Sequence, residues 1–382
     1  MSKPIPAGNP ALLDRIRNEI RESGPMPFAR FMELALHDPE HGYYSPGGDR
    51  LGKKGDFFTS SDVGTIFGSC VARQIGEMDV ALGCPRPFTV MEFGAGRGLL
   101  AADILGSIDN DNHDLAGRLS YLMIDSSPGM RSQASLLVPE ALAVAPDELQ
   151  GGNTGCILAV ELFDALPVHR VRRRDGKLIE VFVDVDDDGD LVETESSPSH
   201  DVAEMAGRYG AASREGTESE LCPAYRKVLD LMDRTLDRGF IIMIDYGLRA
   251  HELYGPAYAR GTLLAYHRHT TNEDYLRRVG EQDLTAHVNY SAIEDHARQL
   301  GWTMMGLTTQ DRFLIGNGIL EQFEARDESQ WNDPAHVKGR LQAMQLIHPE
   351  GMGRTFSIMI LSRGVEPVPD LAGLRDPFRR KV

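Results

Sequence analysis

The chain has 382 residues, with 57 acidic and 40 basic side chains and a net charge of −17, which argues against a nucleic-acid partner because phosphate contacts need a basic face. No apolar run approaches the roughly 20 residues of a membrane span, and the first residues resemble neither a signal peptide nor a transit peptide, so we expect a cytoplasmic protein without a membrane partner. The four cysteines form no C-x-x-C pair, so neither a metal site nor a disulfide framework is expected.

The first 82 residues are predicted to form an extension ahead of the main fold. Apolar residues recur at helical spacing in three segments, separated by stretches rich in Pro and Gly. The predicted helices span 11–22, 28–36 and 63–82. The segment 37–49 is too rich in Pro, Gly and Asp for regular structure, and Gly55–Asp62 is an aromatic loop of a length that indicates a function.

The segment from Phe88 to Leu105 carries the strongest functional pattern. Phe88–Phe93 is predicted to be a buried strand, and Leu99 begins a helix with an apolar face. Between them stands Glu-x-Gly-x-Gly-x-Gly, which differs from the G-x-G-x-x-G of dinucleotide sites and is typical of methyltransferases that use S-adenosyl-L-methionine. The glycines let the backbone approach the cofactor, and the acid anchors the loop or meets the cofactor's ammonium. The predicted cofactor-binding residues here are Glu92, Gly94, Gly96 and Gly98.

A second predicted strand, Leu119–Ile124, is followed directly by Asp125. In a Rossmann-like fold an acid at this point holds the ribose hydroxyls, so Asp125 is predicted to bind the cofactor, with Ser126 beside it. Either Ser126 or Ser127 is expected to cap the next helix. The acidic stretch 109–114 lengthens the spacing between the glycines and Asp125 and is predicted to be a solvated loop.

Two acids follow the fourth predicted strand. Strands are expected at 141–145 and 155–160, and Glu161 and Asp164 come after the second of these. Ligands of an open α/β sheet bind beyond the carboxyl ends of its strands. Both carboxylates are therefore predicted to be catalytic: they face the transferred methyl group, hold a cationic or amine nucleophile and take up its proton. In the alternative interpretation, Asp164 caps a helix and Glu161 is simply solvated.

The rest of the chain continues the α/β pattern. A hairpin is predicted at 168–174 and 178–185, followed by acidic surface loops at 184–190 and 194–200. The later predicted elements are a helix at 223–238, a strand at 239–245 ending in Asp245, a helix at 289–300 capped by Ser291, an edge pair of strands at 302–307 and 355–361, and a mostly helical insert at 311–349. Asp245 either faces the site or belongs to a turn. The insert contains Trp331 and is a candidate lid or homodimer surface.

Nine blocks of residues together resemble one known family. They are Gly24-Pro25, Asp38–Ser45, Gly55–Thr59, Glu92–Gly98, Glu161–His169, Ile244–Gly247, Gln282–Val288, Leu346–Pro349 and Met352-Gly353. These blocks resemble the MidA-like family of class I methyltransferases, which includes an arginine methyltransferase. The resemblance implies an α/β fold with a Rossmann-like sheet, parallel with an antiparallel edge strand, plus an N-terminal helical extension and helical insertions. It also implies S-adenosyl-L-methionine as cofactor and an arginine of a protein as methyl acceptor.

Applied to this chain, the resemblance gives a linear domain scheme. Residues 1–82 form the extension, 83–365 the methyltransferase domain with insertions near 175–235, 248–285 and 311–350, and 366–382 a tail. Thr59 is predicted to close over the cofactor and Asp56 over the substrate. The family has an Arg-His pair similar to Arg268-His269, so these two residues, with Asp245, are predicted to bind the substrate rather than a metal.

This chain departs from the family in segments that are expected to face the substrate. The family's Thr-x-Pro-Glu-Ile-Ser is Thr59–Gly64 here, without the proline, and in Thr285–Tyr290 the amide of Asn289 replaces a carboxylate. Two other functions therefore stay open beside protein arginine methylation. One is O- or N-methylation of a small molecule or peptide in a biosynthetic pathway. The other is a non-catalytic assembly factor that binds the cofactor.

Overall fold

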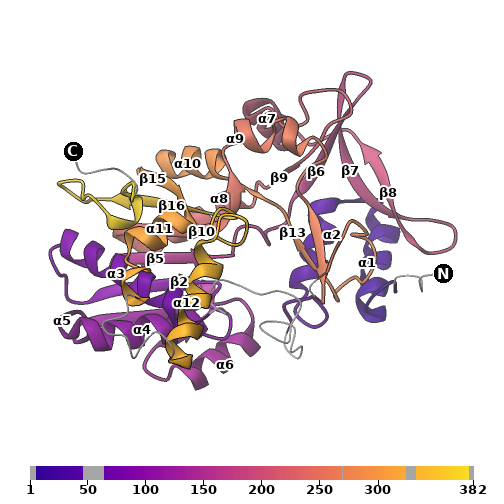
Figure 1. Ribbon diagram of the computed structural model, residues 1–382. Helices are drawn as coiled ribbons and strands as arrows, with labels where there is room; N and C mark the ends of the chain where they lie inside the picture. Colours follow the sequence, from indigo (N-terminus) through magenta and orange to yellow (C-terminus); the bar gives the residue numbers. More distant parts are fainter. Residues whose placement is uncertain (1–5, 46–63, 269, 324–332, 378–382) are drawn as a thin grey trace. The chain divides into compact units, whose positions relative to one another are not determined.

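A computed structural model describes residues 6–45, 64–268, 270–323 and 333–377 (Figure 1). Internal contacts divide the chain into two compact units. Unit 1 holds the described parts of 1–57 together with 163–229 and 247–296. Unit 2 holds the described parts of 58–162 together with 230–246 and 297–382. Each unit thus combines stretches from distant parts of the sequence, whereas the predicted domain scheme is linear.

Unit 2 is built on a mixed sheet with the strand order β15-β16-β10-β5-β2-β3-β4 (Figure 1). The strands from β10 to β4 run parallel, and β16 runs antiparallel to β10. The bounds are β2 Phe88–Phe93, β3 Leu119–Ile124, β4 Leu142–Val144, β5 Asn153–Val160, β10 Leu236–Leu248, β15 Thr303–Thr309 and β16 Phe356–Arg363. Nearly continuous apolar runs form the central strands because parallel sheets are buried on both faces. The predicted Rossmann-like sheet with an antiparallel edge is confirmed.

Helices complete unit 2 around one apolar core, in which Phe67, Ile104 and Leu158 are fully buried. Helices α3 and α4 lie side by side (Figure 1). Gly68 allows this approach, since a Cβ there would lie only 2.4 Å from Cβ of Asp103. The bounds are α3 Thr65–Ala81, α4 Leu99–Asp111, α5 His113–Ala116, α6 Pro128–Leu137, α11 Gln310–Gly316 and α12 Pro334–Ile347, with the short turns η2 Pro146–Glu148, η4 Glu321–Phe323 and η6 Ala372–Leu374.

Unit 1 contains two antiparallel sheets. The larger has the order β1-β7-β6-β9, with β8 also paired to β7, and the smaller has the order β12-β11-β13. The bounds are α1 Pro10–Ser23, β1 Met26–Pro27, α2 Phe28–His37, β6 His169–Arg174, β7 Lys177–Val185, β8 Leu191–Ser196, α7 His200–Tyr209, β9 Glu218–Leu221, α9 Ala250–Leu253, η3 Pro256–Tyr258, β11 Leu264–His267, β12 Thr270–Asn272, β13 Asp283–Thr285 and β14 Val288–Asn289. Helices α8 (Tyr225–Thr235) and α10 (Tyr290–Gln299) each have residues assigned to both units. The insertions near 175–235 and 248–285, which were expected to be helical, contain strands as well as helices: β7, β8 and β9 beside α7 and α8 in the first, and β11, β12 and β13 beside α9 and η3 in the second.

The predicted solvated loop at 109–114 is wrong, because this stretch is helical. Helix α4 continues through Asp111, and the side chain of Asn112 accepts the N–H of Leu115 and so caps α5. Leu115 is fully buried and anchors this short helix. The acidic residues point to solvent, where their charge is compatible with helix formation.

The predicted acidic loops at 184–190 and 194–200 are confirmed only in part. Strand β8 pairs with β7 from Leu191 to Ser196. Residues 186–190 and 197–199 form neither strand nor helix, and α7 begins at His200. Arg172 forms ion pairs with Glu193 at 2.7 Å and with Glu195 at 3.8 Å. Such pairs between strands stabilise a sheet in which the acidic residues by themselves have low strand propensity.

The segment after β16 packs against α3. Leu371 is buried, the N–H of Ala372 donates to Glu77 at 2.7 Å, and the N–H of Gly373 donates to Gln74 at 2.9 Å. Residues 366–377 are therefore part of unit 2. Among the described residues, no helix is long and apolar enough to cross a membrane.

Candidate active site

The carboxyl ends of β2, β3 and β5 lie side by side in the unit 2 sheet, next to residues 244 and 245 of β10, which continues to Leu248. Phe93 of β2 is paired with Ile124 of β3 and with Ala159 of β5, and Ile244 of β10 is paired with Val160. The residues that directly follow these strand pairs are Gly94, Asp125, Glu161 and Asp245. The fold thus brings together four of the residues that the sequence predicts for the site.

The glycine turn between β2 and α4 contains two positions with different requirements. The φ angle is +53° at Gly96 and +80° at Gly98. A Cβ at Gly98 would lie 3.1 Å from Sδ of Met123 and 3.2 Å from Cβ of Ala134, so packing requires this glycine. Among the described residues, a Cβ at Gly96 would meet no other atom within 4 Å. The space beside Gly96 is therefore open to a ligand, as the predicted cofactor site requires.

Asp125 connects the end of β3 to the glycine turn. One of its carboxylate oxygens accepts the N–H of Gly96 at 3.0 Å, and the other accepts the N–H of Ser127 at 2.8 Å. The residue is half-buried, and a carboxylate oxygen can accept more than one hydrogen bond, so Asp125 fits the predicted role at a ribose diol. Ser126 beside it is exposed, and Ser127 caps α6 by accepting the N–H of Met130.

Glu92 is buried within β2, with 4% of its surface exposed. The hydroxyl of Tyr121 on β3 donates a hydrogen bond of 2.8 Å to it. Burial raises the pKa of Glu92 to about 7; the Tyr121 hydrogen bond opposes this shift and the negative charge of Asp125 adds to it. Glu92 therefore titrates near neutral pH, close to the acid that is predicted to bind the ribose.

Glu161 adopts a strained backbone at the end of β5. Its φ angle is +51°, in the left-handed region, which costs a residue with a Cβ about 1–2 kcal/mol. Its N–H donates to the carbonyl of Ile244 at 2.8 Å, so pairing with β10 holds this conformation. Strain at a half-buried acid beside a ligand edge is typical of functional residues. The neighbouring Asp245 is 1% exposed and accepts the N–H of Tyr246 at 2.8 Å. It is paired with Ser357 inside β10, which continues to Leu248, so it does not belong to a turn.

Asp164 lies in unit 1 with three residues that the sequence did not predict for the site. No helix begins at Asp164, so it is not a helix cap. Asp164 and Asp283 are each 3% exposed, and the hydroxyl of Tyr44 donates to Asp283 at 2.9 Å. Tyr266 is paired with Asp283 between β11 and β13, which puts both side chains on one face of the small sheet. We name Tyr44, Asp164, Tyr266 and Asp283 the aspartate–tyrosine cluster.

Electrostatics link the four members of this cluster. Burial raises the pKa of Tyr44 well above its usual value, and the charges of Asp283 and Asp164 raise it further. Burial also raises the pKa of Tyr266, and the same two carboxylates add to the shift. Both tyrosines therefore stay protonated at neutral pH and can donate hydrogen bonds. Tyr44 lies in the family block Asp38–Ser45 and Asp283 in the block Gln282–Val288. Their place in these blocks was the only signal in the sequence analysis that could have identified them as functional residues.

The structure gives less information on the roles of the remaining predicted site residues. Asp56, Thr59 and His269 lie outside the described residues. Arg268 is exposed in the turn between β11 and β12, with a φ angle of +49°. In His267, Nδ1 lies 3.0 Å from the carbonyl oxygen of Glu281, and Nε2 lies 3.1 Å from Arg278. No group of three or more potential metal ligands occurs within the described ranges. The substrate roles of Arg268 and Asp245 stay predictions.

Comparison with known proteins identifies the family. Residues 70–308 match the model Methyltransf_28, which describes S-adenosyl-L-methionine-dependent methyltransferases. The chain belongs to this MidA-like family. It is 29% identical over 397 residues to "Protein arginine methyltransferase NDUFAF7 homolog, mitochondrial" of Drosophila melanogaster, covering 94% of this chain and 86% of that protein. It is 28% identical over 388 residues to "Protein arginine methyltransferase NDUFAF7, mitochondrial" of Homo sapiens, covering 93% and 85%.

A solved structure of the family extends this finding to the cofactor. The chain resembles a Burkholderia thailandensis protein crystallised with S-adenosyl-homocysteine, with a TM-score of 0.86, 30% identity and 97% coverage of both chains. The protein is therefore a methyltransferase whose cofactor is S-adenosyl-L-methionine, as the sequence predicts. The open space at Gly96 and the carboxylate of Asp125 fit such a ligand.

One departure from the MidA-like pattern has a structural explanation. Asn289 caps α10, since its side-chain oxygen accepts the N–H groups of Ser291 at 3.1 Å and Ala292 at 3.2 Å. The predicted cap, Ser291, is wrong, because its hydroxyl instead accepts the N–H of Ala250 at 3.0 Å. The aspartate usual in the family caps a helix equally well, and the amide also donates to the hydroxyl of Tyr254 at 3.2 Å. This substitution therefore preserves a cap and does not indicate a different acceptor.

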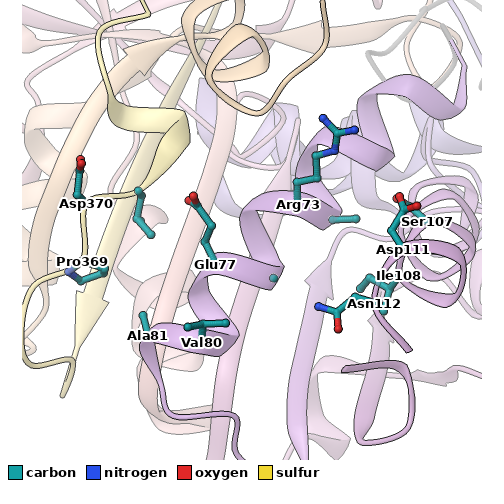
Figure 2. A pocket seen from close by; sticks show the side chains of 13 residues that line it. Arg73, Glu77, Val80, Ala81, Ser107, Ile108, Asp111, Asn112, Pro369 and Asp370 are labelled. Carbon is teal, nitrogen blue, oxygen red and sulfur yellow. The ribbon is translucent and has the colours of Figure 1, made fainter. Parts of the chain in front are cut away.

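A groove of about 530 Å³ in unit 2 is lined by described residues, none of which was predicted for the site (Figure 2). Its walls come from α3, α4 and the segment 369–371. Arg73 in this groove donates to the carbonyls of Asn317 and Gly318, both at 3.2 Å, and Glu77 accepts the N–H of Ala372. These two polar side chains therefore serve internal packing.

Proposed function

We propose that this methyltransferase modifies a guanidino nitrogen of an arginine in a protein acceptor. The observation that carries the proposal is Glu161, an acid with a strained backbone at the edge that also bears the glycine turn and Asp125. The two relatives described above are named as protein arginine methyltransferases, which supports arginine as the acceptor. The net charge of −17 favours a cationic partner.

The roles of the residues follow from the chemistry of methyl transfer. When bound, the cofactor supplies a methyl group that its sulfonium already activates for displacement by the acceptor nitrogen. Asp125 binds the ribose hydroxyls, and the backbone at Gly96 leaves room for the ligand. The protein aligns the acceptor nitrogen with the methyl group and excludes water. Glu161 accepts the proton that the nitrogen loses as its bond to carbon forms.

Asp164 has a second role in this proposal. A free guanidinium has a pKa above about 12, so an arginine reaches the enzyme with its positive charge. A carboxylate can accept two parallel N–H groups from a guanidinium and so fixes its plane. Asp164 orients the acceptor in this way and is the second choice, after Glu161, as proton acceptor.

Methyl transfer from labelled S-adenosyl-L-methionine tests the proposal. The acceptors are a set of basic proteins and, in parallel, a panel of small molecules and peptides with hydroxyl and amino groups. We expect labelled methylarginine in protein hydrolysates. Glu161→Gln should lower turnover roughly 100-fold or more while S-adenosyl-homocysteine affinity changes only a few-fold. Glu140→Gln, at an exposed acid of unit 2, is the matched control and should leave both unchanged.

Other outcomes would replace the proposal. Label that enters only the small-molecule or peptide panel would assign a biosynthetic O- or N-methyltransferase. Cofactor binding without transfer to either set would assign an assembly factor. The cytoplasmic location and a homodimer also stay predictions, to be checked by cell fractionation and by the mass of the protein in solution.

A further inference from the structure

The aspartate–tyrosine cluster brings together three family blocks that are far apart in the sequence. Tyr44 comes from Asp38–Ser45, Asp164 from Glu161–His169, and Asp283 from Gln282–Val288. The Tyr44 hydroxyl donates to Asp283 at 2.9 Å, and the N–H of Ala286 donates to the carbonyl of Asp164 at 3.1 Å. The blocks therefore build one structure within unit 1.

The cluster combines buried negative charge with aromatic surface. The carboxylates of Asp164 and Asp283 are almost fully buried, whereas Tyr44 and Tyr266 are half-buried and so reach solvent. A guanidinium is recognised by both kinds of group, because carboxylate oxygens accept its N–H groups and aromatic faces attract its charge. The composition of the cluster therefore fits an arginine side chain.

Unit 1 already holds one of its own guanidinium groups in this manner. Cζ of Arg170 lies 5.0 Å from the ring centre of Phe28 and 4.9 Å from that of Tyr275. Nε of the same side chain donates to Glu218 at 2.8 Å. This internal site combines carboxylate and aromatic groups as the cluster does. Its cation is the guanidinium of Arg170, whereas the four members of the cluster include no cation.

The cluster is also fixed before any acceptor arrives. The ring of His37 stacks on Tyr44 with centroids 5.6 Å apart and an interplanar angle of 21°. Nε2 of His37 lies 3.1 Å from the carbonyl oxygen of Ala165, next to Asp164. These contacts restrain Tyr44 and the Asp164 loop, and a restrained site loses less entropy on binding.

We propose that Asp283, held by Tyr44, is a specificity-determining residue that acts with Asp164 to bind the cationic side chain of the methyl acceptor. Two carboxylates on one guanidinium select an arginine over a neutral group of the same shape. This inference rests on the proposed function and adds the residues that choose the acceptor.

Binding of two matched probes tests it. Nα-acetyl-arginine methylamide carries the guanidinium, and Nα-acetyl-citrulline methylamide is its neutral isostere. Both are titrated into the full chain with S-adenosyl-homocysteine present, and binding is followed by calorimetry or NMR. We expect the wild type to bind the arginine probe at least tenfold more tightly. Asp283→Asn should weaken that probe about 10- to 100-fold, the usual range for a hydrogen bond to a charged group, and leave the citrulline probe unchanged.

A matched control and a second variant protect this test against misfolding. Asp295→Asn alters another acid of unit 1 that accepts a tyrosine hydroxyl, that of Tyr209 at 3.0 Å, and should leave both probes unchanged. Tyr44→Phe keeps the ring and should weaken the arginine probe several-fold, because Asp283 loses its donor. In each variant, unchanged affinity for S-adenosyl-homocysteine reports an intact cofactor site.

The outcomes separate this inference from the proposed function. If the wild type methylates arginine but Asp283→Asn binds the arginine probe normally, the role of Asp283 is overturned and the proposed function stands. If the wild type binds the two probes equally, the cluster does not select a cation. If the arginine probe binds preferentially but no arginine is methylated, the proposed function fails while the cluster remains a cation site.

Discussion

Gly96→Val separates cofactor binding from folding in unit 2. A side chain with a Cβ at a φ angle of +53° costs about 1–2 kcal/mol, and somewhat more when it is branched. The new Cβ meets no other atom of the described residues within 4 Å, so these residues add no packing penalty around it. Domains are typically stable by about 5–15 kcal/mol, so the variant should fold. Its methyl groups would occupy the ligand space, so affinity for S-adenosyl-L-methionine should fall more than about 100-fold.

Thermal unfolding with and without S-adenosyl-homocysteine measures both effects. At a ligand concentration of 100 Kd, binding stabilises the wild type by about 2.7 kcal/mol. For a protein of this size the corresponding rise in Tm is roughly 5–10 °C, at about 2–4 °C per kcal/mol. Gly96→Val should show no rise and no heat of binding in calorimetry, while its Tm without ligand falls by only a few degrees.

Two other glycines are the controls. At Gly98→Ala the Cβ would lie 3.1 Å from Sδ of Met123, so this variant should be destabilised even without ligand. Gly106 lies in α4, where no atom of the part of the chain that the structure describes lies within 4 Å of its Cβ position. Gly106→Ala should bind normally and be about 0.5–1 kcal/mol more stable. Wild-type affinity in Gly96→Val would refute the placement of the cofactor. Failure of Gly96→Val to fold would show that this glycine is needed for the turn itself.

Three further predictions concern acids at the same edge. Asp125→Ala should weaken cofactor binding by about 1–3 kcal/mol in calorimetry, and unchanged affinity would contradict its ribose role. Because the pKa of Glu92 is raised to about 7, its carboxyl favours folding at low pH, and this contribution should be lost as pH rises through 7. Unfolding curves from pH 5 to 8 should show this loss in the wild type and not in Glu92→Gln. Glu161→Gly should be about 1 kcal/mol more stable than Glu161→Ala, because the φ angle of +51° suits glycine, and equal stabilities would show that the strain is relieved elsewhere.

The local sequence pattern was sufficient to predict most of the secondary structure of unit 2. The strands β2, β3 and β5 are short apolar runs bounded by Gly, Pro or acids, and their type follows from the residues themselves. The glycine spacing after β2 and the acid after β3 identified the cofactor class, because parallel strands bring their carboxyl ends to one edge.

Local pattern failed where distant partners decide the structure. The glutamates of β8 look like loop residues, but arginines on β6 neutralise them. The acids at 109–114 look like a loop, but the burial of Leu115 anchors a helix there. In both places tertiary contacts outweigh the weak intrinsic preferences of a few residues.

The sequence by itself determined the chemistry of the methyl donor and the positions of the acids that end the strands. Only the tertiary structure placed Tyr44 against Asp283, because 239 positions separate them and no periodicity relates such distant residues. Only it revealed the left-handed backbone of Glu161, which depends on pairing with β10. Strand type and glycine turns arise from near neighbours, whereas a hydrogen bond between distant blocks exists only after the chain has folded.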